Sequence, residues 1–198
     1  MSKHLPLIFI ISAPSGTGKG TLVKQLLEQV PRLERITTTT TRSVRPGEIA
    51  GKSYIFISQQ QFRDLIEKDA FVEWNHIFDN YYGTFKETVY GNISRAQKKG
   101  GDLVVEIDVD GKRNFMAQFS NTVSIFLLPP SIEDLKKRIL HRNSENPAEI
   151  DKRLSRAAEE ISRKDEFDYQ IVNDQQEETL GQLKNIVETE RSRRDAKK

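Results

Sequence analysis

The segment of the sequence best suited to chemistry is SAPSGTGKGT, residues 12–21. It follows the short apolar run 7–11 and precedes LVKQLLEQV, whose apolar residues have helical spacing. A glycine-rich turn with a lysine and a hydroxyl between a strand and a helix is the pattern of a phosphate-binding loop. Lys19 would reach the β- and γ-phosphates of a nucleotide. The alternative, a glycine-rich turn without a ligand, fits this strand-loop-helix context poorly.

Two positions of this loop depart from the general pattern. Ala13 stands where a first glycine is usual, and Gly20 stands where a hydroxyl that binds magnesium is usual. Either Thr21 supplies that hydroxyl, or nucleotide oxygens and water hold the ion. The predicted nucleotide-binding residues of the loop are Ala13, Pro14, Ser15, Gly16, Thr17, Gly18, Lys19, Gly20 and Thr21.

A second candidate phosphate site follows the first. It contains Thr38, Arg42 and Arg45, with the tripeptide PGE directly after at 46–48. Two arginines three residues apart can present planar guanidinium groups to one phosphate, a geometry that arginine serves better than lysine. A solvated basic loop is the alternative for this stretch taken alone. A nucleotide-binding loop alone does not indicate which reaction is catalysed. A second phosphate site reduces the number of possible reactions.

The composition limits the remaining classes. A chain of 198 residues can bury one core, so we expect a single domain over 1–198. The net charge of +2 is too small to indicate a nucleic-acid or membrane partner by itself, and no apolar run approaches the roughly 18 residues of a membrane-spanning helix. The absence of cysteine excludes disulfides and fits a reducing compartment. We therefore expect a cytoplasmic protein that binds neither nucleic acid nor membrane, and we leave a homo-oligomer open.

The elements that must position these residues come from short β-branched runs that alternate with amphipathic segments. The expected strands are 7–11, 36–41, 103–109, 123–128 and 169–172. Three of them are almost wholly apolar, as strands are when helices cover both faces of a sheet. The fold class predicted is α/β, with a parallel sheet flanked by helices.

Capping residues mark where helices should begin. Ser58 with Gln61 forms a capping box before the helix expected at 59–68, and Ser131 with Asp134 has a similar place before 135–140. Pro147 suits the first turn of a long helix that continues to about residue 164. A last helix is expected over roughly 178–194.

Two regions interrupt the alternation. Residues 54–85 contain the expected strands YIFI and FVEW around a helix and then an expected aromatic turn, DNYYGTF at 79–85. This pattern predicts a small insertion of mixed structure. Residues 141–156 are polar and charged, and they form either a lid that carries arginines or a surface helical hairpin.

The motifs as a set resemble those of the guanylate kinase family, and GKGT at 18–21 is the form seen in nucleoside monophosphate kinases. The similar segments, in the order of the family, are TTRSVRPGE at 40–48 with Gly51 and Tyr54, FVEW at 71–74, NYYGT at 80–84, ID at 107–108, PPS at 129–131 and IVND at 171–174. The resemblance covers about residues 7–188, nearly the whole chain.

The resemblance implies a P-loop NTPase-like fold and transfer of the γ-phosphoryl group of ATP to GMP, giving ADP and GDP, with Mg²⁺ as the cofactor and dGMP as a further acceptor. It also implies three regions. The core would cover about 5–35, 92–137 and 157–190, the GMP-binding insertion about 36–90, and a helical lid about 138–156.

The resemblance further implies a role for each site residue. Those that hold the phosphate of GMP would be Thr38, Arg42, Arg45, Tyr54 and Tyr82, and those that read guanine would be Glu73, Thr84 and Asp108. The cations that share the transferred charge would be Lys19, Arg42, Arg138, Arg142 and Arg153. Asn173 would lie near the adenine, and Thr21 and Glu106 are the candidate metal-binding residues.

These implied roles agree with the chemistry of guanine. Guanine presents N1–H and an exocyclic amine as adjacent donors and O6 as an acceptor, so carboxylates suit the first two and a hydroxyl suits the third. Adenine would place an acceptor against a carboxylate. A phosphate monoester, with a second pKa of about 6, is already mostly dianionic near neutral pH, so the acceptor needs no general base.

Two departures from the family pattern and two rival functions stand beside this reading. His141, Arg142 and Asn143 replace the usual Gly-Arg-Gly of the lid, and Glu106 stands where aspartate is frequent. A relative that phosphorylates ribose 1,5-bisphosphate would have no use for Glu73 and Asp108 as base readers. A guanylate-kinase-like scaffold domain typically loses the function of the phosphate loop, whose lysine is present here.

Overall fold

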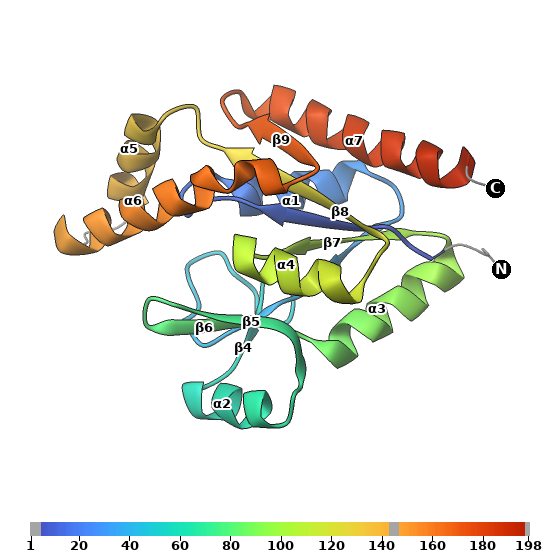
Figure 1. Cartoon of the computed structure of the whole chain (residues 1–198), viewed down its shortest axis with the longest axis horizontal. Helices are drawn as coiled ribbons and strands as arrows, with labels where there is room; N and C mark the ends of the chain where they lie inside the picture. The colour runs from blue at the N-terminus through green and yellow to red at the C-terminus, as the bar shows by residue number, and fades with distance from the viewer. Residues whose placement is uncertain (1–4, 143–146, 197–198) are drawn as a thin grey trace. The chain divides into compact units, whose positions relative to one another are not determined.

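The computed structural model describes residues 5–142 and 147–196. A five-stranded sheet has the strand order β2-β7-β1-β8-β9, and a four-stranded sheet has the order β4-β3-β6-β5 (Figure 1). The strands of the first sheet are β1 (Ile8–Ser12), β2 (Leu33–Ile36), β7 (Asp102–Glu106), β8 (Thr122–Leu128) and β9 (Tyr169–Val172). The pairs β2 with β7 and β8 with β9 are parallel, which confirms the predicted α/β class.

The chain divides into two compact units, which are described one at a time. Unit 1 comprises Met1–Ile10 and Arg32–Thr122, and unit 2 comprises Ile11–Pro31 and Val123–Lys198. The residues predicted to bind GMP all belong to unit 1. Those predicted to bind ATP belong to unit 2, as does the expected lid.

Unit 1 has a core built from β-branched and aromatic side chains of β2, β7 and the helices α3 (Lys86–Lys99) and α4 (Val109–Gln118). Every residue of β7 is buried, as expected for a central strand covered on both faces. Ile36, Val105 and Phe115 lie in this one cluster. The core therefore fixes the end of β7 and the start of α4, where Glu106 and Asp108 stand.

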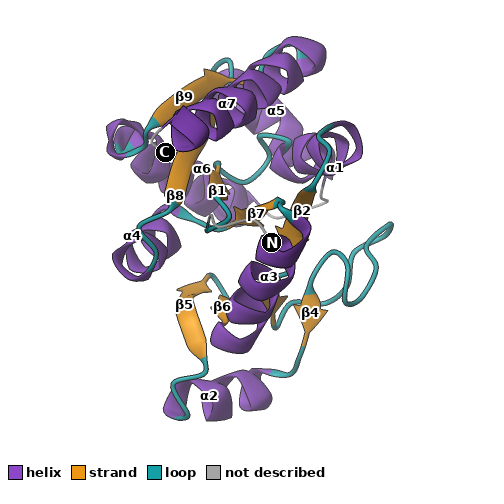
Figure 2. Cartoon of the chain, turned by 90° about the vertical axis from the view of Figure 1, so that its right-hand side faces the viewer, coloured by secondary structure: helices purple, strands orange, loops and turns teal. Residues whose placement is uncertain are grey.

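The mixed sheet of unit 1 contains β3 (Thr39–Thr40), β4 (Ile55–Phe56), β5 (Phe71–Ile77) and β6 (Asn80–Phe85). Helix α2 (Gln59–Glu67) lies beside the β5–β6 hairpin (Figures 1 and 2). The capping box predicted at its start is confirmed, because Ser58 accepts from the backbone of Gln61 while the Gln61 side chain accepts from the backbone of Ser58. Stacked rings of Phe62, Phe71 and Tyr81 fill the space between helix and hairpin.

Two sequence-based predictions in unit 1 are wrong. Residues 36–41 are not one strand, because β2 ends at Ile36 and the chain then enters the second sheet as β3. Residues 79–85 are not a turn, since β6 runs over Asn80–Phe85 and pairs antiparallel with β5 and β3. The hairpin reverses at Phe78, which has a positive φ of 54°.

Unit 2 contains α1 (Lys19–Gln29), α5 (Ile132–Arg142), α6 (Pro147–Ser162), a short 3₁₀ helix η1 (Lys164–Glu166) and α7 (Gln176–Ala196). The hydroxyl of Ser131 accepts from the backbone of Asp134, 3.0 Å away, as the predicted cap requires, and α6 begins at Pro147 as predicted. Helices α5 and α6 share a small apolar cluster that includes Leu135 and Ile139. Within 5–142 and 147–196, no helix combines the length and the apolar composition needed to cross a membrane.

Candidate active site

The glycine loop of unit 2 has the backbone geometry that its glycines suggest. Gly16 and Gly18 both have a φ of 94°, in the region that disfavours every residue with a Cβ. Gly18 is also the N-cap of α1, and a Cβ there would lie 3.2 Å from the amide nitrogen of Asn173. At Gly16 a Cβ would lie 3.2 Å from the side chains of Leu135 and Ile139. The loop therefore packs directly against α5 and the residue that follows β9.

Two predicted site residues hold this loop through one backbone carbonyl. The side-chain nitrogen of Asn173 donates to the carbonyl of Thr17 at 2.5 Å, and Nη1 of Arg138 donates to the same oxygen at 3.3 Å. Asn173 is buried, with 6% of its surface exposed. The structure thus brings both residues to the phosphate loop, while contact of Asn173 with adenine stays a prediction.

Lys19 is the first residue of α1, half-buried at the helix N-terminus, and the first turn contains no acidic residue. Positive potential from the helix N-terminus therefore adds to the lysine charge. Thr21 is exposed in the same turn. In the expected lid, Arg153 lies half-buried on α6, and the side chain of Arg142 and all of Asn143 lie outside the described residues.

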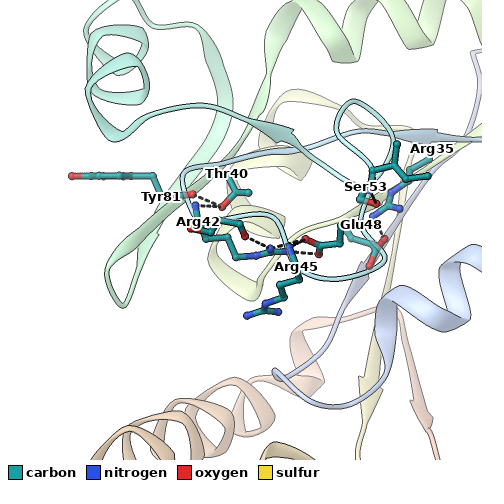
Figure 3. Close-up of polar contacts among 10 residues, drawn as sticks. Arg35, Thr40, Arg42, Arg45, Glu48, Ser53 and Tyr81 are labelled. Atoms are coloured by element: carbon teal, nitrogen blue, oxygen red, sulfur yellow. Dashed lines mark hydrogen bonds and ion pairs between the residues drawn. The ribbon is translucent and has the colours of Figure 1, made fainter. Parts of the chain in front are cut away.

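The arginine pair of unit 1 is organised by a carboxylate that the sequence reading did not single out. Glu48 forms a two-pronged ion pair with Arg42, with Nη1 to Oε2 at 2.7 Å and Nη2 to Oε1 at 2.5 Å (Figure 3). The backbone nitrogen of Arg45 also donates to Oε2 of Glu48, at 2.9 Å. The guanidinium of Arg45 is exposed and extends away from Glu48 (Figure 3). The two guanidinium groups are close in the chain, but they do not converge on one point.

Aromatic rings surround the Arg42 guanidinium. Its central carbon lies 5.0 Å from the ring centre of Tyr54 and 5.7 Å from that of Phe56. Tyr54 and Tyr82 meet edge to face with ring centres 6.4 Å apart, and burial raises the pKa of Tyr54 above its ordinary value. The backbone of Thr38, which is also buried, binds the strand that carries these rings, because its carbonyl accepts from Ile55 at 2.8 Å.

The predicted guanine-reading residues lie together in unit 1, with Glu73 and Thr84 buried and Asp108 half-buried. The hydroxyl of Thr84 donates to Oε1 of Glu73 at 2.5 Å across the β5–β6 pair, and both residues are buried. Oδ1 of Asp108 caps α4 by accepting from the backbone of Gly111 at 2.7 Å. The same oxygen accepts from the side-chain amide of Asn75, also at 2.7 Å.

Gly111 explains how two carboxylates come together at the start of α4. A Cβ on this residue would lie 2.5 Å from Oε2 of Glu73 and 3.2 Å from Oδ1 of Asp108. Only a residue without a side chain therefore allows the helix this close to both acids. The positive end of the helix dipole favours carboxylates at that place.

Glu106 is the other candidate metal-binding residue, and it lies buried in unit 1. Its Oε1 forms an ion pair with Nη2 of Arg35 at 2.5 Å. Among the described residues, no three acidic or histidine side chains lie close enough together to hold a metal ion. This donor set still suits Mg²⁺, which usually takes one or two protein ligands and fills its remaining positions with substrate phosphates and water.

Sequence reasoning missed four residues of these groups: Arg35, Glu48, Asn75 and Gly111. A signal existed for Asn75, because it is two residues after Glu73 and so shares its strand face. The PGE tripeptide at 46–48 is visible in the sequence, yet nothing in the sequence indicates where its carboxylate points. The roles of Arg35 and Gly111 depend on contacts between distant segments, which spacing does not reveal.

Known proteins resemble the chain along nearly its whole length. The family model described as guanylate kinase matches residues 6–190 of the chain. A curated guanylate kinase of Caldanaerobacter subterraneus subsp. tengcongensis is 41% identical over 196 residues, which cover 99% of this chain and 93% of the relative. One of Geobacter sulfurreducens is 40% identical, over 96% of this chain and 92% of the relative.

A solved structure of a protein with the same name is also similar to this chain. The crystal structure of guanylate kinase from Anaplasma phagocytophilum superimposes with a TM-score of 0.76 at 31% sequence identity. The superposition covers 96% of this chain and 88% of that one.

Proposed function

The chain belongs to the guanylate kinase family and is an ATP:GMP phosphotransferase. We propose how its residues take part in the transfer of the γ-phosphoryl group from ATP to GMP. The observation that carries the proposal is the buried contact between Glu73 and Thr84. A carboxylate and a hydroxyl, buried side by side, match the donors and the acceptor on the base edge of guanine.

When guanine binds, its N–H groups are proposed to replace the Thr84 hydroxyl as the hydrogen-bond donors to Glu73. Without a base, the Thr84 hydroxyl donates its single proton to Glu73. The N1–H and the amine of guanine are proposed to take over as donors to this carboxylate, which frees the Thr84 proton for O6. Asp108, held at the N-terminus of α4, is proposed to accept from the remaining donor of the base.

The phosphate of GMP is proposed to bind the cluster around Arg42. Arg42 and Arg45 supply the positive charge, and the hydroxyls of Thr38, Tyr54 and Tyr82 supply further donors. The acceptor oxygen is then a dianionic phosphate oxygen, which attacks without loss of a proton. The protein therefore positions the reactants and neutralises charge instead of acting as a base.

On the ATP side, the backbone of residues 13–21 is proposed to surround the phosphates, with Lys19 at the β- and γ-phosphates. Arg138, Arg142 and Arg153 are proposed to share the charge of the transferred group, and Asn173 to lie near the adenine. The candidate residues for Mg²⁺ are Thr21 in unit 2 and Glu106 in unit 1, and the ion would supply neutralisation of phosphate charge. We further propose a GMP-binding region over about 36–90, a lid over about 138–156, and a cytoplasmic location.

An acceptor panel tests the reaction. The release of ADP from ATP is measured with GMP, AMP, CMP, UMP, ribose 1,5-bisphosphate or no acceptor. ADP should form with GMP and at background rates with the other acceptors. Turnover with the sugar bisphosphate and none with GMP would contradict the proposal.

A paired substitution tests the base reading. Glu73→Gln replaces an acceptor by a donor, so kcat/KM for GMP should fall by about 100-fold or more. Glu67→Gln, at an exposed position at the end of α2, is the matched control and should leave kcat/KM unchanged. If the two substitutions change kcat/KM for GMP equally, Glu73 does not bind the base.

A further inference from the structure

The side chain of Glu48 connects the two arginines of the phosphate site. Its Oε1 accepts from Nη2 of Arg42, and its Oε2 accepts both from Nη1 of Arg42 and from the backbone nitrogen of Arg45. The side chains of the pair are 9% and 20% exposed for Arg42 and Glu48. Charge-assisted, two-pronged contacts of this kind fix the plane of a guanidinium as well as its position.

The hydrogen bonds of Arg42 show which edge of its guanidinium is available to bind a phosphate. The group has five N–H bonds. Nη1 uses its two on the Ser43 carbonyl, 2.8 Å away, and on Glu48, while Nη2 uses one on Glu48. Among residues 5–142 and 147–196, this leaves two N–H groups without a partner, the Nε–H and the second N–H of Nη2, which lie parallel on one side of the fork. That side has the spacing for two oxygens of one phosphate.

The backbone explains how Glu48 reaches back to Arg42. Residues 45–48 form a tight turn in which the Glu48 nitrogen donates to the Arg45 carbonyl at 3.1 Å. Pro46 occupies its second position and Gly47, with a φ of 83°, its third, which is the pattern of a type II turn. The turn reverses the chain so that the Glu48 side chain points at the residues that precede it.

The rings of Tyr54 and Phe56 restrict Arg42 from another direction, at 5.0 and 5.7 Å. A long side chain that is held by a carboxylate at its tip and by aromatic rings along its plane has little rotational freedom left to lose when a ligand binds. The arrangement is therefore preorganised before any phosphate arrives.

We propose that Glu48 is a positioning residue for GMP, which holds Arg42 so that its Nε–Nη2 edge faces the phosphate. The inference rests on the proposed function, in which Arg42 binds that phosphate. Glu48 itself touches no substrate. Its negative charge opposes the phosphate, and the orientation that it gives to Arg42 outweighs this repulsion.

The test compares a ligand that has the phosphate with one that lacks it. Binding of GMP and of guanosine to the full chain is measured by calorimetry for the parent protein, Glu48→Gln and the control Glu67→Gln. Glu48→Gln should weaken GMP binding about tenfold and leave guanosine binding unchanged, because it removes the charge and one acceptor from the ion pair. Glu67→Gln should alter neither affinity.

A double-substitution cycle separates the inference from the function on which it rests. Arg42→Lys should weaken GMP binding, and adding Glu48→Gln to it should cause little further loss, since Glu48 acts through Arg42. If Arg42→Lys weakens GMP binding and Glu48→Gln leaves it unchanged or tighter, the positioning role is wrong and the phosphate site stands. If Arg42→Lys has no effect on GMP, the site assignment itself fails, and the inference with it.

A purely structural role for Glu48 predicts a different pattern. Loss of GMP and guanosine affinity by the same factor would show that Glu48 supports the fold of the region, and this would overturn the positioning role. If Glu48→Gln does not fold, Glu48→Asp keeps the charge but shortens the reach by one methylene, and it should give the same selective loss of GMP affinity.

Discussion

Arg35 and Glu106 form an ion pair between neighbouring parallel strands, with Nη2 of Arg35 2.5 Å from Oε1 of Glu106. The Glu106 side chain is 4% exposed and that of Arg35 is 21% exposed. A carboxylate this deeply buried needs a partner, because burial of an unpaired charge is strongly unfavourable. Arg35 therefore holds Glu106 at the end of β7, two residues before Asp108.

Breaking this pair should destabilise the fold. Arg35→Met is expected to lower the free energy of unfolding by about 2 to 3 kcal/mol, because it leaves the Glu106 carboxylate unpaired. Urea unfolding gives the value. Arg95→Met is the control, since Arg95 pairs with Glu34 at an exposed site where such pairs contribute about 1 kcal/mol or less. Recovery of most of the lost stability in the double variant Arg35→Met with Glu106→Gln would identify the unpaired charge as the cause.

The close approach at Gly111 gives a prediction about GMP. Gly111→Ala would place a methyl group 2.5 Å from Oε2 of Glu73, so Glu73 must move and KM for GMP should rise about tenfold or more. KM for ATP should not change. Gly91→Ala on α3, where a Cβ would meet no atom within 4 Å, is the matched control and should leave both KM values unchanged. A rise in KM for GMP in both variants would argue against a local effect.

The Arg42–Glu48 pair should give stability that depends on pH. Hydrogen bonding from Arg42 holds the pKa of Glu48 below its ordinary value of 4.5. A group whose pKa is lower in the folded state stabilises the fold above its unfolded pKa, and this contribution disappears as the pH falls through the folded pKa. The parent protein should therefore exceed Glu48→Gln in stability at pH 7, and the difference should shrink below pH 4.5. A difference that does not vary between pH 7 and pH 3 would contradict the assignment.

Lys19 should affect turnover more than acceptor binding. Lys19→Met removes a cation from the phosphate loop, and kcat is expected to fall about 100- to 1000-fold, as for other donors that stabilise charge in a transition state. The affinity for GMP, measured by calorimetry, should not change. Lys24→Met, an exposed position on the same helix, is expected to keep full activity. Normal turnover in Lys19→Met would exclude the proposed role.

Water must be excluded if phosphate is to pass between nucleotides instead of being hydrolysed, so ligands should order the regions that cover them. We expect amide hydrogen exchange in residues 36–90 and 138–156 to slow when ADP, GMP and Mg²⁺ are bound together. Mass spectrometry measures the change, with α7 as the internal reference. Equal exchange with and without the ligands would contradict closure.

Local signals predicted parts of the fold well. The capping box at Ser58 and Gln61 depends only on residues three apart, and it formed as expected. The strand at 169–172 has the predicted bounds, since a short apolar run between polar segments has few alternatives. Features that depend only on residues close together in the chain can be predicted from the sequence.

The wrong predictions concern features that depend on contacts with other segments of the chain. A run of five threonines has uniform strand propensity, so nothing in it marks the place where the chain leaves one sheet for another. Residues 80–85 form a local hairpin with β5, which their aromatic pattern did not reveal, and their pairing with β3 joins segments that are distant in the sequence. The same reason hides the pairing of Arg35 with Glu106.

Two residues, Thr37 and Thr38, separate β2 from β3, and so they connect the five-stranded sheet to the four-stranded sheet along the chain. Side chains alternate between the faces of a strand, so a shift by one residue would turn every following side chain of β3 to the opposite face. Thr40, whose hydroxyl donates to the carbonyl of Tyr81, would lose that contact, and the arginine segment after it would start from the wrong side. The length of this junction should therefore tolerate neither an insertion nor a deletion, because either one would reverse the faces of β3.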